Sequence, residues 1–107
     1  MGNDRQMVDP STRSEITVTV TMLTPEQGGR SRPVVLVDPY RPHLRAHGDE
    51  TYLGVQFPTE GGRTMTAGEP LSFRVRLLYD LDYSRLQPGV AFDVLEGAKI
   101  VGTGVVA

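Results

Sequence analysis

The chain has 107 residues, which is enough for one domain and too few for a second hydrophobic core. It contains no cysteine, which excludes disulfides, thiolate metal sites and a cysteine nucleophile. Its formal net charge of −2, from 13 acidic and 11 basic residues, argues against a protein that coats nucleic acid or an anionic membrane by bulk charge. Lys99 is the only lysine, so a local basic patch would consist mainly of arginines, whose planar fork suits phosphate and carboxylate.

The N-terminal segment, residues 1–13, has no hydrophobic periodicity and contains Pro10. We therefore expect a flexible N-terminal tail followed by a single folded unit at residues 14–107. The segment also lacks the apolar core of a secretory signal, and no run approaches the about 20 apolar residues that span a bilayer. The expectation is a cytoplasmic protein that does not contact a membrane.

The first half of the folded unit reads as short strands. Apolar residues alternate with threonines over 16–22, which predicts a strand with one buried face. Pro25 and the glycine pair at 28–29 then predict a change of direction. The apolar run at 34–37 and the extended segment at 43–46 predict two further short strands.

The second half continues this pattern. A strand is predicted over 52–57, and loops are predicted at 59–63 and 66–70. A long strand is expected over 71–81, with six apolar residues on one face: Leu71, Phe73, Val75, Leu77, Tyr79 and Leu81.

The last predicted elements are a strand at 92–94, a hairpin turn at 96–98 and a final strand. In that final strand Gly102 and Gly104 share a face with Ile100 and Val106, which permits the close backbone approach found where a barrel closes or where a partner presses in. No segment shows helical periodicity over three turns, so the sequence predicts an all-β barrel or sandwich.

Catalytic patterns are missing. There is neither a phosphate-binding G-x-x-x-x-G-K-[ST] loop nor a G-x-S-x-G nucleophile elbow, and we expect no enzyme, no cofactor and no metal. His43 and His47 would lie about 13 Å apart on an extended chain, too far to share one ion. Asp80 and Asp82 would be about 6.6 Å apart, a separation that inverting glycosidases use, but the sequence gives no sign of a cleft around them. A solvated strand face is the preferred interpretation.

The loop Gly28-Gly29-Arg30-Ser31-Arg32 is where backbone amides and two guanidinium groups could converge on a phosphate. The alternative is a plain loop with solvated arginines. Arg74 and Arg76 would extend such a patch if their strand lies beside the first strand.

Three separated segments occur in one order: Gln27-Gly28-Gly29-Arg30, then Pro39-Tyr40-Arg41-Pro42, then the closing run from Glu96 to Ala107. Together they resemble the third domain of bacterial translation elongation factor Tu over residues 13 to 107. The resemblance implies a single small antiparallel six-stranded β-barrel. In that family the Gly-Gly-Arg turn and the later Glu-Gly turn contact the T-stem backbone of tRNA.

Carried over by position, and with the second loop arginine added, the RNA-binding residues expected here are Gly29, Arg30, Arg32, Glu96 and Gly97. We expect the segment Tyr40, Arg41 and Pro42 to belong to a partner interface.

This sequence also departs from the family. Ser31-Arg32-Pro33 stands where the family has His-Thr-Pro, and residues 46–54 replace its Thr-Thr-Asp-Val-Thr-Gly stretch. The sequence-based hypothesis is a non-catalytic binding module for the T-arm of tRNA or for a translation-related protein such as a GTPase domain. The alternative is a protein-interaction or homo-oligomerisation barrel that binds no nucleic acid.

Overall fold

The computed structural model describes residues 14–79 and 81–107, and the tail predicted at 1–13 lies outside these ranges. The described elements are eight strands and one 3-10 turn: β1 (Glu15–Met22), η3 (Pro25–Gln27), β2 (Val34–Leu36), β3 (His43–Ala46), β4 (Leu53–Gln56), β5 (Arg63–Met65), β6 (Leu71–Leu77), β7 (Ala91–Glu96) and β8 (Lys99–Val106). No helix in these two ranges is long and apolar enough to cross a membrane.

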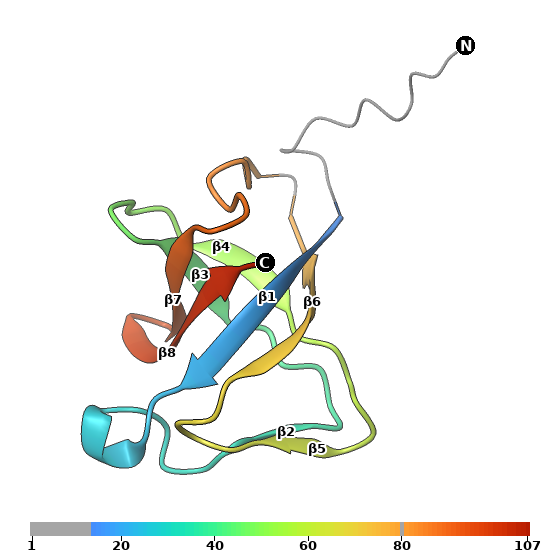
Figure 1. The fold of residues 1–107 in the computed structure, drawn as a ribbon, viewed down its shortest axis with the longest axis vertical. Coiled ribbons are helices and arrows are strands. Elements are labelled where there is room, and N and C mark those ends of the chain that lie inside the picture. The colour runs from blue at the N-terminus through green and yellow to red at the C-terminus, as the bar shows by residue number, and fades with distance from the viewer. Residues whose placement is uncertain (1–13, 80) are drawn as a thin grey trace.

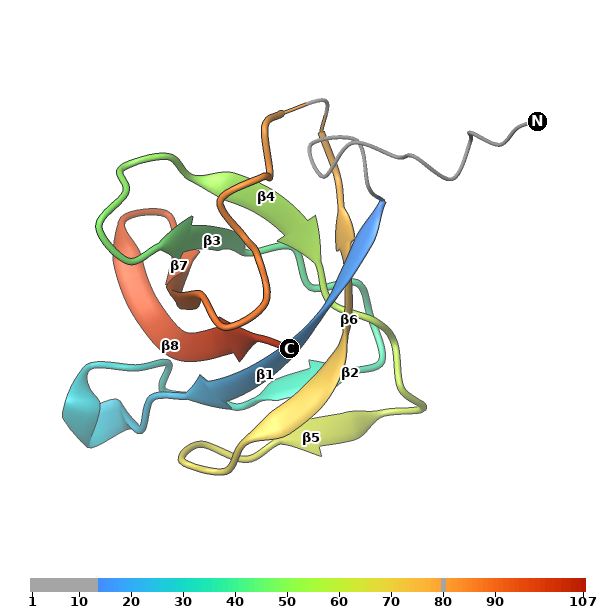
Figure 2. The same ribbon diagram turned by 45° about the horizontal axis from the view of Figure 1, so that its top comes forward.

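Six of the strands form a closed antiparallel barrel in the order β1-β6-β4-β3-β7-β8, which confirms the expected all-β fold. Figure 1 shows the other two, β2 and β5, as a separate ladder at one end of the barrel. The tilted view in Figure 2 shows the strands of the barrel enclosing its interior. Side chains fill that interior, because Val18, Val55 and Phe92 are each fully buried.

The barrel closes where β1 pairs with β8, and small residues allow this approach. Thr19 lies opposite Val105, and Val20 lies opposite Gly104. A β-carbon on Gly104 would be 2.5 Å from Cζ of Phe92 and 2.6 Å from the carbonyl oxygen of Thr19. Only glycine fits there, as expected from the sequence.

The predicted facing of Ile100 was wrong. A register shift between Val94 and Leu95 opposes Leu95 to Ile100, whereas Val94 lies opposite Gly102. Val101 is therefore the extra residue of a bulge, and it is fully buried while Ile100 is exposed.

The long strand predicted over 71–81 ends at Leu77, so the expectation that Tyr79 and Leu81 face the core was also wrong. Both side chains are exposed, Tyr79 by 59% and Leu81 by 41%. The neighbouring β1 does not extend past the level of Leu77, whose amide donates to the carbonyl of Ser14. Tyr83 is the aromatic residue buried in this region, at 1% exposure.

Residues 63–65 were predicted to lie among loops, and they form β5 instead. Val34 pairs with Met65, Val35 with Thr64 and Leu36 with Arg63. Three residues are too few to show an alternation of apolar and polar side chains. The strand is recognised by its pairing with β2, which is distant in the sequence. Met65 is buried against the core, whereas Arg63 and Thr64 are exposed.

Candidate functional site

The glycine pair before Arg30 has a structural role. Thr24 and Gln27 form a capping box around η3, and Gly28 ends this turn with φ of 90°. Gly29 is buried, and its amide donates to the carbonyl of Thr24 at 2.9 Å. A β-carbon on Gly29 would be 2.3 Å from the carbonyl oxygen of Leu23. Gly29, predicted to bind RNA, is thus held inside the loop and fixes the position of the next residue.

Arg30 extends from this loop to the end of β7. Its Nη1 donates to Oε2 of Glu96, and its Nε donates to the carbonyl of Arg32 at 3.0 Å. The hydroxyl of Tyr40 donates to the same Oε2 of Glu96. The guanidinium carbon of Arg30 also lies 5.4 Å from the centroid of the Tyr40 ring. We call Arg30, Tyr40 and Glu96 the carboxylate cluster.

The carboxylate cluster is partly shielded from water. The side chains of Arg30 and Glu96 are 31% and 33% exposed. Burial raises the pKa of the Tyr40 phenol well above its usual range, and the hydrogen bond to Glu96 and the charge of Glu96 raise it further. For Arg30, burial lowers the pKa, but the hydrogen bond and the charge of Glu96 outweigh it, so the pKa is raised. The cluster therefore favours a protonated phenol and a charged guanidinium.

The turn between β7 and β8 brings a further cation to this place. Glu96 pairs with Lys99 across two turn residues, and Gly97, the first of these, has φ of 61°. Gly97 is exposed, and no heavy atom outside its immediate neighbours lies within 4 Å of a β-carbon built on it. The predicted hairpin turn is confirmed, and Gly97 shapes it.

A depression of about 220 Å³ lies between the loop and this turn. We call it the basic depression; its lining residues are Arg30, Ser31, Arg32, Glu96 and Lys99. Three cations and one carboxylate give it a formal net charge of +2. Arg30 and Glu96 neutralise each other, whereas Arg32 and Lys99 have no salt bridge within the described ranges. An anion could therefore bind here between Arg32 and Lys99.

Sequence reasoning had assigned no role to Lys99. The available signal was the Gly97-Ala98 pair, because a two-residue turn places the residues on either side of it opposite each other. Ser31 was named as part of the loop 28–32 and as a departure from the family pattern, without a role of its own.

The segment predicted to be a partner interface is divided by the fold. Tyr40 belongs to the carboxylate cluster, and its ring packs edge to face on Phe57 with centroids 5.2 Å apart. Pro42 is buried, and its carbonyl accepts from the amide of Val55 at 3.1 Å. Only Arg41 is exposed, and its Nε donates to Gln56 Oε1 at 2.8 Å. The structure thus places Tyr40 with the predicted RNA contacts rather than in a separate surface.

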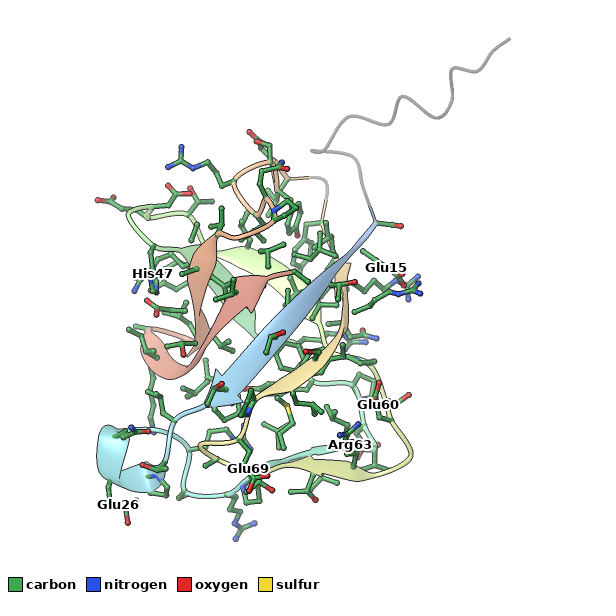
Figure 3. All side chains as sticks on the ribbon, viewed as in Figure 1. Glu15, Glu26, His47, Glu60, Arg63 and Glu69 are labelled. Atoms are coloured by element: carbon green, nitrogen blue, oxygen red, sulfur yellow. The ribbon has the colours of Figure 1, made fainter. Side chains whose placement is uncertain are left out.

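The strand carrying Arg74 and Arg76 does lie beside β1, as the sequence argument required. Arg74 nevertheless pairs with Glu15 at 3.4 Å, and the surface hollow beside it shares no residue with the basic depression. Figure 3 shows Glu15 at the start of β1, with Glu60 and Arg63 together near the β2–β5 ladder. These arginines do not extend the basic depression.

The histidines lie on separate contacts. His43 stacks obliquely on Tyr52 with ring centroids 5.8 Å apart, while His47 Nε2 lies 3.0 Å from Asp93 Oδ1. Figure 3 places His47 on the side of the barrel near β3 and β7. No group of three histidine or acidic side chains among the described residues could hold a metal ion.

Of the two aspartates compared with a glycosidase pair, Asp80 lies outside the described residues. Asp82 accepts from the amide of Ser84 at 2.9 Å, and the side-chain and backbone hydrogen bonds of Ser84 lower its pKa. This hydrogen bond belongs to a local turn.

No protein-family model matches the chain.

Proposed function

We propose that this barrel is a non-catalytic binding module that grips an RNA backbone at the basic depression. The observation that carries the proposal is the pair of cations, Arg32 and Lys99, which have no salt bridge to a described residue and lie beside an arginine already fixed in place. Phosphate contacts from arginine, lysine and hydroxyl side chains position RNA without reading its sequence. The resemblance to the third domain of elongation factor Tu makes the T-arm of tRNA the preferred target.

The two loop arginines have different roles in this proposal. Arg32 and Lys99 contact phosphates, because their charges are not balanced by a carboxylate in the described ranges. Arg30 is a positioning residue, because its guanidinium group already contacts Glu96 and the Tyr40 ring. Its Nε donates a hydrogen bond to the carbonyl of Arg32. Gly29 and Gly97 act through the shape of the loop and of the turn rather than by contact.

A titration of a fluorescently labelled T-arm hairpin RNA, followed by anisotropy across a salt series, tests this proposal. For duplex phosphates we expect the logarithm of affinity to fall by about 0.9 per logarithm of salt for each phosphate neutralised. Arg32→Ala and Lys99→Ala should each weaken binding. Each should also make the dependence of affinity on salt less steep, by the amount expected for about one phosphate contact. Arg76→Ala is the matched control, because Arg76 is exposed on the barrel wall away from the basic depression.

Binding that survives both substitutions, or no binding at low salt, would contradict the proposal.

A protein-interaction or oligomerisation role is the second candidate, and the exposed valines of the β2 region favour it. Val35 is 43% exposed and Val37 is 59% exposed. Sedimentation at high protein concentration distinguishes the two, because self-association through these valines should be lost in Val35→Ser and should not depend on Arg32 or Lys99.

A further inference from the structure

A second hollow, more apolar than the basic depression, adjoins it. We call this hollow of about 240 Å³ the apolar groove; η3 and the end of β1 form one side of it, and β2 and β5 form the other. Its apolar lining includes Met22, Pro25, Pro33, Val34, Met65 and Ala67. Met22, Val34 and Met65 are themselves at most 4% exposed, so they provide a floor that belongs to the core. The two methionines make that floor adaptable in shape.

The size of the apolar groove limits what can enter it. At about 240 Å³ it is smaller than the roughly 300–1,000 Å³ of sites that enclose a drug-sized ligand. One large apolar side chain is therefore a better match than a whole cofactor or nucleotide.

The lining residues also favour a protein side chain over a nucleobase as the ligand of the apolar groove. Sites that bind single-stranded nucleic acid stack bases on aromatic rings. No aromatic residue lines the apolar groove. Aliphatic and thioether groups suit an apolar protein side chain, for which contact area rather than stacking supplies the affinity.

The charges beside the apolar groove indicate which group a ligand should carry next to its apolar side chain. Arg30, Ser31 and Arg32 line both the apolar groove and the basic depression, so the two hollows border the same loop. A ligand that leaves the groove there meets Arg32 and then Lys99, neither of which has a salt bridge in the described part of the chain. Glu26 on η3 points away from the barrel (Figure 3). A carboxylate next to the apolar side chain would match these cations.

We propose that the apolar groove binds a segment of a partner protein in which a large apolar residue lies beside acidic residues. The apolar side chain enters between η3 and the β2–β5 ladder, and a neighbouring carboxylate contacts Arg32. This inference does not depend on RNA binding. It does predict that such a segment and RNA exclude each other, because both require Arg32.

The probes for the test are capped pentapeptides added to the whole 107-residue chain, with methyl NMR as the readout. Gly-Asp-Phe-Asp-Gly should shift the methyl signals of Met22, Val34 and Met65. Gly-Asp-Ala-Asp-Gly lacks the apolar side chain, and Gly-Lys-Phe-Lys-Gly reverses the charge. The lysine peptide should bind at least about fivefold more weakly, since one exposed charge contact changes affinity by about that factor. The alanine peptide should bind at least about tenfold more weakly, because it lacks the large apolar side chain whose burial supplies the affinity.

Three variants and one control variant separate this inference from the proposed function. Ala67→Leu should fill the groove and weaken the peptide without affecting RNA, and Lys99→Ala should weaken RNA more than the peptide. Arg32→Ser should weaken both, whereas Arg76→Ser should weaken neither. Equal binding of the lysine peptide, or methyl signals that stay unmoved at millimolar Gly-Asp-Phe-Asp-Gly, would overturn the inference. Shifts of the Met22 and Met65 methyls by a single-stranded RNA, but not by the peptide, would assign the groove to nucleic acid instead.

Discussion

Arg30 and Glu96, which are 66 residues apart in the sequence, are joined by a salt bridge in the folded protein. Both had been expected to face RNA. Glu96 instead neutralises Arg30, and a carboxylate at this position opposes the binding of a phosphate. The contact therefore has opposite effects on stability and on RNA affinity.

Glu96→Gln should separate these two effects. Loss of the carboxylate charge should lower the free energy of unfolding by about 0.5–1 kcal/mol, since the pair is partly exposed. The same change frees Arg30 and should strengthen RNA binding, with a steeper dependence on salt. Urea unfolding and RNA anisotropy on one preparation measure both quantities. Weaker RNA binding by a stably folded variant would mean that Glu96 orients Arg30 for the RNA instead of competing with it.

Tyr40 should make stability depend on alkaline pH. Burial and Glu96 raise the pKa of Tyr40 above its ordinary value of 10.0, so the folded state favours the protonated phenol. The stabilisation is complete below pH 10 and is lost as pH rises through the raised pKa of the folded protein. Tyr40→Phe should cost about 1–2 kcal/mol at pH 8, because a hydrogen bond to a charged group is lost.

The measurement is the free energy of unfolding in urea for both proteins from pH 8 to pH 11. The difference between wild type and Tyr40→Phe should shrink above pH 10. A constant difference over that interval would show that the phenol of Tyr40 does not titrate with folding.

The two glycines predicted to bind RNA should differ in their tolerance of alanine. Gly29→Ala places a β-carbon against the backbone of Leu23, so something must shift, and we expect a loss of about 2–3 kcal/mol. Gly97→Ala meets open space and bears only the strain of φ at 61°, about 1 kcal/mol. Thermal or urea unfolding of the two variants provides the comparison. Equal losses would indicate that the Gly29 loop can relax away from Leu23.

Removal of the Tyr83 hydroxyl should cost more stability than removal of the Tyr52 hydroxyl. Its hydroxyl donates to the carbonyl of Gly54 at 2.7 Å and accepts from the amide of Tyr79 at 3.2 Å. Tyr83→Phe would remove both hydrogen bonds, of which the one to Gly54 is buried, at about 1–3 kcal/mol. Tyr52→Phe is the matched control, since Tyr52 is 37% exposed. Urea unfolding that finds the two variants equally stable would contradict this assignment.

The sequence predicted the barrel well because alternation reports burial directly. β1 shows this, with Ile16, Val18, Val20 and Met22 all buried. Alternation does not report where a neighbouring strand stops, which is why Tyr79 and Leu81 were misplaced beyond the end of β6. Three-residue strands such as β5 depend on pairing that a local pattern does not contain.

The candidate site was only partly predictable for the same reason. Arg30, Tyr40 and Glu96 were each singled out, but they come from a loop, an isolated bridge and a strand end. Only the topology of the barrel brings them together. The structural role of Gly29 follows from its contact with Leu23, which no spacing rule reveals.

The pairing of β1 with β8 joins the first and last strands of the described chain, and the amide of Ala107 donates to the carbonyl of Thr17. During synthesis, β1 emerges from the ribosome long before the strand that completes one of its two ladders. Until β8 arrives, the unpaired edge of β1 is exposed to other chains. Folding of this barrel should therefore be completed only after β8 has emerged, and loss of the last residues of β8 would reopen that edge.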